Sequence, residues 1–316
     1  MDLNITDNTP HLLVVGGTGF IGSNLCDAAI KKGWKVTSLS LNKKKIIDSS
    51  NLNKSIIYLS ADIAQEDSLK AAFINNKYDY IINMGGYVNH SNFYDDGKKI
   101  IDTHFNGLLN LIRNIDFSYC KKFINTGSSD EYGDIVGPQE ESMLPLPNSA
   151  YAFSKYAGNN FLEYLFRSEK LPVCGIRLFL VYGPGQNKQR FLPQIIKGCL
   201  EKKSFPVSEG NQIRDFCYID DVVEAIFRIF ENATTSGHIF NIASGDPIKI
   251  KEMILKVKNV IGYGSPSFGD VSYKKNENMS LYANISKIKK FTEWKPVVNL
   301  DDGINKTVSH YINSYE

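Results

Sequence analysis

Apolar and polar positions along the first 180 residues form two alternating patterns. Strands are predicted where short apolar runs occur, at residues 12–15, 35–40, 55–60, 78–84, 122–127 and 173–180. Helices are predicted where apolar residues recur with a helical period, at residues 21–32, 66–75, 98–115 and 149–167. Because strands that alternate with helices build a parallel sheet covered on both faces, we expect an α/β fold around a doubly wound parallel sheet.

The pattern changes after residue 181, where the turn cluster Tyr182-Gly183-Pro184-Gly185-Gln186 follows the sixth predicted strand. The later elements are predicted as helices at 191–202, 221–230, 250–260 and 302–311 and as short strands at 205–207 and 238–242. We expect residues 1–181, with 212–245 returning to the sheet, to form the larger domain. Residues 182–211 and 246–316 are then expected to form a smaller C-terminal α/β lobe.

A glycine cluster, Gly16-Gly17-Thr18-Gly19-Phe20-Ile21-Gly22, stands directly between the first predicted strand and the first predicted helix. Gly16 lets the chain turn off a buried strand, Gly19 lets the backbone approach a pyrophosphate, and Gly22 lets the helix pack closely on the sheet. The helix N-terminus, with Phe20 and Ile21 in its first turn, offers N–H groups to phosphate. A glycine motif alone can be an ordinary turn, but this position predicts a dinucleotide site of the Rossmann type.

The end of the second predicted strand bears on which dinucleotide is bound. An acidic residue there would bind the 2′-hydroxyl of NAD, whereas basic residues favour the 2′-phosphate of NADP. This chain has Ser40 at that position, followed by Asn42 and the run Lys43-Lys44-Lys45. The sequence therefore favours NADP and leaves NAD open, and the lysine run can also be interpreted as a solvated loop.

Tyr151 and Lys155 are four residues apart in a predicted helix, so their side chains project from the same face. Tyrosine has a pKa of about 10, and a neighbouring ammonium group favours the phenolate and lowers that pKa. Such a pair can move a proton while a nicotinamide moves a hydride. Ser128 follows the fifth predicted strand, where its hydroxyl could bond to a reacting oxygen. The alternative is an exposed aromatic ring beside a solvated lysine, which the glycine loop and Ser128 upstream disfavour.

With these residues in place, the chain resembles the extended short-chain dehydrogenase/reductases, in the NAD-dependent epimerase/dehydratase family that modifies nucleotide sugars. The resemblance rests on Gly16 to Gly22, Asp62-Ile63, Ser128 before Tyr132-Gly133, Tyr151 with Lys155, Arg177, Tyr182 to Gly185, Arg214-Asp215-Phe216, Asp220-Asp221-Val222, Asn241 and Trp294-Lys295-Pro296. It covers nearly the whole chain and implies a Rossmann sheet with a smaller α/β lobe that binds the nucleotide sugar.

The resemblance also implies roles for single residues. Ser128, Tyr151 and Lys155 would form a catalytic triad, and Lys155 would also hold the nicotinamide ribose. Further cofactor contacts would come from Asp62 and Ile63 at the adenine and from Gly86 and Asn106 near the cofactor.

On the substrate side, Arg214 is the expected ligand of the diphosphate, because a guanidinium group binds phosphate in a bidentate manner. A surface ion pair is the alternative for Arg214. Arg190 is a second candidate that could equally be solvated, and Ser129 and Asp130 are candidate substrate contacts beside Ser128.

Two departures from the family pattern bear on the reaction. Leu180 stands where many relatives carry an Asn, which weakens a match to UDP-galactose 4-epimerases. Ser128-Ser129-Asp130 stands where sugar 4,6-dehydratases carry Thr-Asp-Glu or Thr-Ser-Glu, and the run from Gly127 to Gly133 looks more like the 4-keto-sugar reductases.

We therefore expect an NAD(P)-dependent oxidoreductase that acts at C4 of a nucleotide-activated sugar, as a 4-keto-sugar reductase or 4-dehydrogenase. A 4-epimerase with tightly bound NAD, and then a sugar 4,6-dehydratase, stay open as alternatives. A dinucleotide sensor without enzyme activity is disfavoured, because such proteins typically lose part of the triad and this chain has all three members.

Composition and charge indicate which kinds of binding partner and which cellular location to expect. The 316 residues carry 36 basic and 34 acidic side chains, and a net charge of +2 gives no general excess for binding nucleic acid. The N-terminal residues lack the features of a secretory signal, and no apolar run reaches the roughly 20 residues that span a bilayer. The five cysteines form no CxxC pair, so we expect reduced thiols, no metal site and a cytoplasmic location. The family resemblance further suggests a homodimer.

Overall fold

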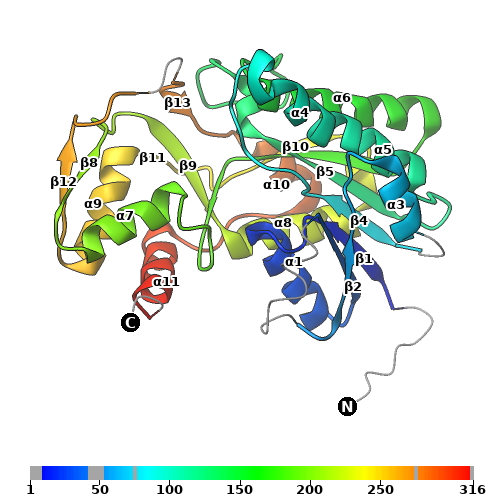
Figure 1. The fold of residues 1–316 in the computed structure, drawn as a ribbon, viewed down its shortest axis with the longest axis horizontal. Coiled ribbons are helices and arrows are strands. Elements are labelled where there is room, and N and C mark those ends of the chain that lie inside the picture. Colours follow the sequence, from blue (N-terminus) through cyan, green and yellow to red (C-terminus); the bar gives the residue numbers. More distant parts are fainter. Residues whose placement is uncertain (1–8, 42–52, 74–76, 274–276, 314–316) are drawn as a thin grey trace. The chain divides into compact units, whose positions relative to one another are not determined.

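The computed structural model describes residues 9–41, 53–73, 77–273 and 277–313 (Figure 1). The chain divides into two compact units. The first unit contains residues 1–131, 147–177 and 226–239, and the second contains 132–146, 178–225 and 240–316. We describe each unit by itself.

The main sheet has seven strands in the order β10-β6-β5-β4-β1-β2-β3. The strands are β1 (His11–Val15), β2 (Lys35–Ser40), β3 (Ile56–Ser60), β4 (Tyr80–Asn83), β5 (Lys122–Ser128), β6 (Val173–Leu178) and β10 (Ile239–Ile242). Pairing is parallel from β5 through β4, β1 and β2 to β3. Every residue of β1 is buried, as expected for a central strand covered on both faces. The predicted α/β fold is confirmed.

The helices of the first unit connect these strands. They are α1 (Phe20–Lys31), α3 (Glu66–Phe73), α4 (Lys98–Ile101), α5 (Gly107–Asn114), α6 (Ala150–Glu169) and the C-terminal half of α8 (Ile219–Glu231). Figure 1 shows α3, α4, α5 and α6 on one side of the sheet and α1 on the other. The helix predicted over 98–115 is preceded by a π-helical turn at Phe93–Gly97 and is interrupted by a second one at Asp102–Asn106. Such turns often lie at functional sites.

The second unit contains a smaller sheet in which β9 (Ile213–Tyr218) pairs with β7 (Leu180–Tyr182), β11 (Pro247–Lys249) and β13 (Ser280–Leu281). A two-stranded sheet joins β8 (Ser204–Val207) to β12 (Ser265–Phe268). Its helices are α7 (Phe191–Leu200), α9 (Ile250–Ile261), α10 (Ser286–Thr292) and α11 (Leu300–Asn313). Within the stretch 212–245, β10 joins the main sheet, whereas β9 belongs to the smaller sheet.

All five cysteines are buried free thiols. Across the ranges that the structure covers, no helix combines the length and the apolar character needed to cross a membrane.

Candidate active site

The glycine loop between β1 and α1 is closely packed and leads into a helix N-terminus without a side-chain cap. Gly16 has a φ of +86°, and a Cβ atom there would lie 2.7 Å from the carbonyl oxygen of Met84. A Cβ atom at Gly22 would lie 2.4 Å from the carbonyl oxygen of Gly16. No side chain caps the N-terminus of α1 at Gly19, and the first turn of α1 carries no acidic residue. Close packing within the protein thus requires glycine at positions 16 and 22, and the uncapped first turn of α1 offers N–H groups to an anion, so these residues fit a dinucleotide.

At the end of β2, Ser40 is tied to this loop. The Thr18 hydroxyl donates to the Ser40 hydroxyl at 2.9 Å, and the Thr18 backbone N–H points to the same oxygen at 3.3 Å. Ser40 therefore helps to hold the loop, and nothing acidic occupies its position. Asn42 and the Lys43-Lys44-Lys45 run lie outside the described residues.

Asp62 and Ile63, the two residues expected to contact the adenine, directly follow β3 and Ala61. The Asp62 carboxylate accepts a hydrogen bond from the Ala64 backbone N–H at 2.9 Å, which fixes the turn. Ile63 is buried, and a Cβ atom on Gly85 or on Gly107 would lie 2.9 Å from its side chain. Two glycines thus let Ile63 pack between the end of β4 and the start of α5.

Gly86 and Asn106 were both expected near the cofactor, and this stays a prediction. Asn106 is exposed, and its amide donates to Asp102 at 2.9 Å. The side chain that faces Gly86 is that of His104, which lies 2.2 Å from the position a Gly86 Cβ atom would take. Gly86 has a φ of +107°, so both backbone conformation and space favour glycine there.

Tyr151 and Lys155 lie in the first two turns of α6, a helix whose N-terminus is capped by the Ser149 hydroxyl. Lys155 is buried, and its Nζ atom lies 5.8 Å from the centroid of the Tyr151 ring. The ammonium donates to the carbonyl oxygen of Thr126 at 2.8 Å, which holds it in place. Burial lowers the pKa of Lys155 to about 8, and the Glu131 carboxylate opposes this shift. A held cation beside the phenol is what a tyrosine acid or base requires.

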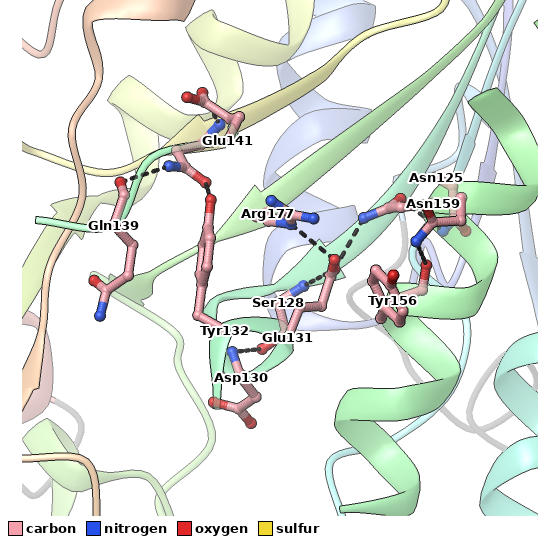
Figure 2. A network of polar contacts seen from close by, with 12 residues as sticks. Asn125, Ser128, Asp130, Glu131, Tyr132, Gln139, Glu141, Tyr156, Asn159 and Arg177 are labelled. Carbon is pink, nitrogen blue, oxygen red and sulfur yellow. Dashed lines mark hydrogen bonds and ion pairs between the residues drawn. The ribbon is translucent and has the colours of Figure 1, made fainter. Parts of the chain in front are cut away.

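Ser128 is positioned by a buried ion pair one turn away (Figure 2). The Glu131 carboxylate accepts hydrogen bonds from the Ser128 backbone N–H at 3.0 Å, from Asn159 at 2.9 Å and from Arg177 at 2.8 Å. Burial raises the pKa of Glu131, while Arg177 and the N–H donors favour its ionised form. A Cβ atom at Gly127 would lie 2.0 Å from a Glu131 oxygen, so the glycine before Ser128 makes room for the pair. The end of β5 is thereby held rigidly.

Two histidines that the sequence motifs did not indicate surround Tyr151. His104 packs edge-on against the Tyr151 ring at a centroid distance of 5.2 Å, and His90 does so at 5.5 Å. His90 Nε2 lies 2.8 Å from an Asp130 carboxylate oxygen, and the Asp130 backbone N–H donates to the Ser128 hydroxyl at 3.1 Å. Ser128, Asp130 and His90 thus form one hydrogen-bonded chain that ends beside Tyr151. Ser129, the other candidate of this turn, is buried.

The two candidate phosphate ligands, Arg214 and Arg190, belong to the second unit. Arg214 lies in β9, where it forms an ion pair with Glu277 and donates to the carbonyl oxygen of Ile213 at 2.8 Å. Arg190 precedes α7 and is exposed.

Comparisons with known proteins agree with this geometry. A family model described as "NAD dependent epimerase/dehydratase family" matches residues 12–243. The chain is 30% identical to an ADP-L-glycero-D-manno-heptose-6-epimerase of Brachyspira hyodysenteriae, covering 93% of this chain and 96% of that protein. It is 27% identical to a CDP-abequose synthase of Salmonella typhimurium, covering 94% and 96%. A UDP-glucuronic acid 4-epimerase of Bacillus cereus, solved with UDP-glucuronic acid and NAD, has a TM-score of 0.85 and 26% identity, covering 96% and 100%.

Proposed function

Because the chain belongs to the NAD-dependent epimerase/dehydratase family, we propose that it transfers a hydride between a nicotinamide dinucleotide and C4 of a nucleotide-activated sugar. One observation carries the proposal: a buried ammonium, that of Lys155, is fixed 5.8 Å from the Tyr151 ring on the same helix. This pair belongs to the same unit as the glycine loop and the rigid end of β5.

The chain's own groups have distinct tasks in this reaction. A bound nicotinamide would supply the hydride chemistry. In reduction, Tyr151 donates its phenolic proton to the oxygen at C4, and in oxidation it accepts that proton. Lys155 stabilises the phenolate that results, and the Ser128 hydroxyl bonds to the same oxygen of the sugar. In the second unit, Arg214 binds the diphosphate of the substrate, with Arg190 as a further ligand.

The choice of dinucleotide stays a prediction. Ser40 in place of an acid favours NADP. The solved UDP-glucuronic acid 4-epimerase, which is similar to this chain, carries NAD, and this supports NAD as the alternative.

Replacement of Tyr151 by Phe tests the proposal. Phe keeps the ring against both histidines but removes the transferable proton, so we expect turnover to fall by about 10²–10⁴-fold. Binding of dinucleotide should stay within twofold of the unmodified protein. Tyr164→Phe is the matched control, because Tyr164 is an exposed tyrosine of the same helix. Unchanged turnover in Tyr151→Phe contradicts the proposal.

A 4-epimerase is the second candidate, and the similarity to the solved UDP-glucuronic acid 4-epimerase supports it. An epimerase must return the same hydride to the sugar, so it is expected to retain its NAD. A reductase must exchange its cofactor in each turnover. We predict that acid denaturation of the purified protein releases less than one tenth of an equivalent of dinucleotide, measured by chromatography and mass spectrometry. Release of a full equivalent of NAD favours the epimerase or the 4,6-dehydratase instead.

A further inference from the structure

His104 is a buried histidine beside Tyr151 that the proposed proton transfer does not use. It lies in the π-helical turn Asp102–Asn106 and is 5% exposed. Its ring contacts Tyr151 edge-on, and its imidazole edge faces Gly86, where any side chain would collide with it. The His104 ring therefore lies beside the Tyr151 and Lys155 pair of the first unit.

One ring nitrogen of His104 has a fixed role. Nε2 lies 2.9 Å from the carbonyl oxygen of Tyr87. A carbonyl oxygen only accepts hydrogen bonds, so Nε2 must carry the proton of the ring. Nδ1 is then an unprotonated acceptor in the neutral imidazole. Burial, followed by the nearby Lys155 cation, lowers the pKa of His104 to about 3, so the ring stays neutral over the working range.

The other ring nitrogen, Nδ1, has no hydrogen-bond partner within the part of the chain that the structure describes. A buried acceptor without a donor is unfavourable, and such groups in native proteins call for an explanation. Gly86, which faces this edge of the ring, has no side chain, and the hydrogen bond that the structure gives the Lys155 ammonium goes to the carbonyl oxygen of Thr126. An uncharged acceptor at this place suits a neutral donor on a ligand.

We propose that His104 Nδ1 accepts a hydrogen bond from a hydroxyl or amide N–H group of the molecule bound beside Tyr151. His104 is thus a ligand-binding residue that orients the reacting groups. This proposal rests on the proposed function only in requiring that a ligand binds beside Tyr151. Both ligand sources present this chemistry: the dinucleotide through its ribose hydroxyls and carboxamide, the sugar through its ring hydroxyls.

Two substitutions separate this role from a structural one. The amide of Gln reproduces the position of Nε2, so His104→Gln keeps the bond to Tyr87 and loses the acceptor. The amide of Asn reproduces the position of Nδ1, so His104→Asn keeps an acceptor and loses the bond to Tyr87. His11→Gln is the control, since His11 is another buried histidine of the first unit, hydrogen-bonded to Thr37 at 2.8 Å.

The affinity for each of the two possible ligands is measured separately by titration calorimetry. One titration uses NADH, and the other uses UDP-glucuronic acid in the presence of NAD. We expect His104→Gln to bind one of them about tenfold more weakly, while His104→Asn and His11→Gln stay within about twofold. A loss in the NADH arm assigns the donor to the dinucleotide, and a loss in the sugar arm assigns it to the sugar. If His104→Asn is the weaker variant, or if both bind both ligands normally, the proposal is overturned.

A second measurement needs no variant. In protein labelled with ¹⁵N-histidine, the Nδ1 resonance of His104 should shift upfield when the donor-bearing ligand is added, because its lone pair then accepts a proton donor. A resonance that neither NADH nor UDP-glucuronic acid moves overturns the proposal. Both binding tests remain readable even if Tyr151→Phe retains full turnover, so the two claims can fail independently.

Discussion

Lys155 is the residue whose ionisation governs the proposed chemistry. Its pKa is lowered to about 8, mainly by burial, so the cation is present below that pH and is lost above it. Since the cation stabilises the Tyr151 phenolate formed during reduction, we expect reductive turnover to fall tenfold per unit as the pH rises past about 8. The measurement is the pH profile of kcat. A kcat that stays level or rises through this range contradicts the assignment.

The same lowered pKa has a consequence for stability. The pKa of Lys155 in the folded protein is below its ordinary value of 10.5, so the buried cation costs stability at neutral pH. That cost disappears as the pH rises from about 8 to 10.5. Lys155→Met should therefore lose activity while gaining about 1–3 kcal/mol in the free energy of unfolding at neutral pH. Urea unfolding measures this, and a loss of stability would show that the ammonium is favourably paired.

His104 and Asn106 illustrate what single residues of a sequence reveal. Asn106 was selected from the family resemblance and is exposed in the structure. His104 stands two residues earlier and is buried, as are Ile100, Leu108 and Leu111 at spacings of three or four residues. That apolar spacing was visible in the sequence and places position 104 on the buried face. An isolated histidine belongs to no motif, so its contact with Gly86 required the structure.

At the scale of elements, long apolar runs were predictable and short polar strands were not. The bounds of β2 and the start of β5 agree with the prediction, because these strands are buried on both faces. The short strands β11, β12 and β13 and the helix α10 were not predicted, since each is too short to show a period. The strand β9 was recognised only as a motif. Its place follows from long-range pairing with β7, β11 and β13, which local patterns do not contain.

The turn after β5 depends on the buried pair of Glu131 and Arg177. Both side chains are nearly inaccessible, with 0% and 2% exposure. Glu131→Gln removes the carboxylate that faces the buried Arg177 guanidinium, so we expect a loss of about 3–5 kcal/mol in the free energy of unfolding. Asp67→Asn is the control, because Asp67 is 98% exposed in its pair with Lys70 and should change stability by less than about 1 kcal/mol. Equal effects in urea unfolding would show that the pair contributes no more than a surface contact.

At the scale of the whole molecule, the sequence predicted two parts with different tasks, and the structure has two units. The dinucleotide loop, Ser128, Tyr151 and Lys155 all belong to the first unit, where Ser128 ends β5 and Tyr151 and Lys155 lie on α6. Arg214 and Arg190 belong to the second. Which nucleotide and sugar they accept does not follow from one arginine motif, since a guanidinium group binds any diphosphate.

The central claim is hydride transfer at C4, and isotope transfer tests it directly. The protein is incubated with NADPH or NADH deuterated at C4 of the nicotinamide and with UDP-, dTDP-, CDP- and GDP-linked 4-keto-6-deoxyhexoses. The products are examined by mass spectrometry and NMR. We predict that one of these sugars gains a single deuterium at C4 and that Tyr151→Phe suppresses this transfer by at least about 10²-fold. Deuterium at another carbon, or equal transfer by Tyr151→Phe, would contradict the account.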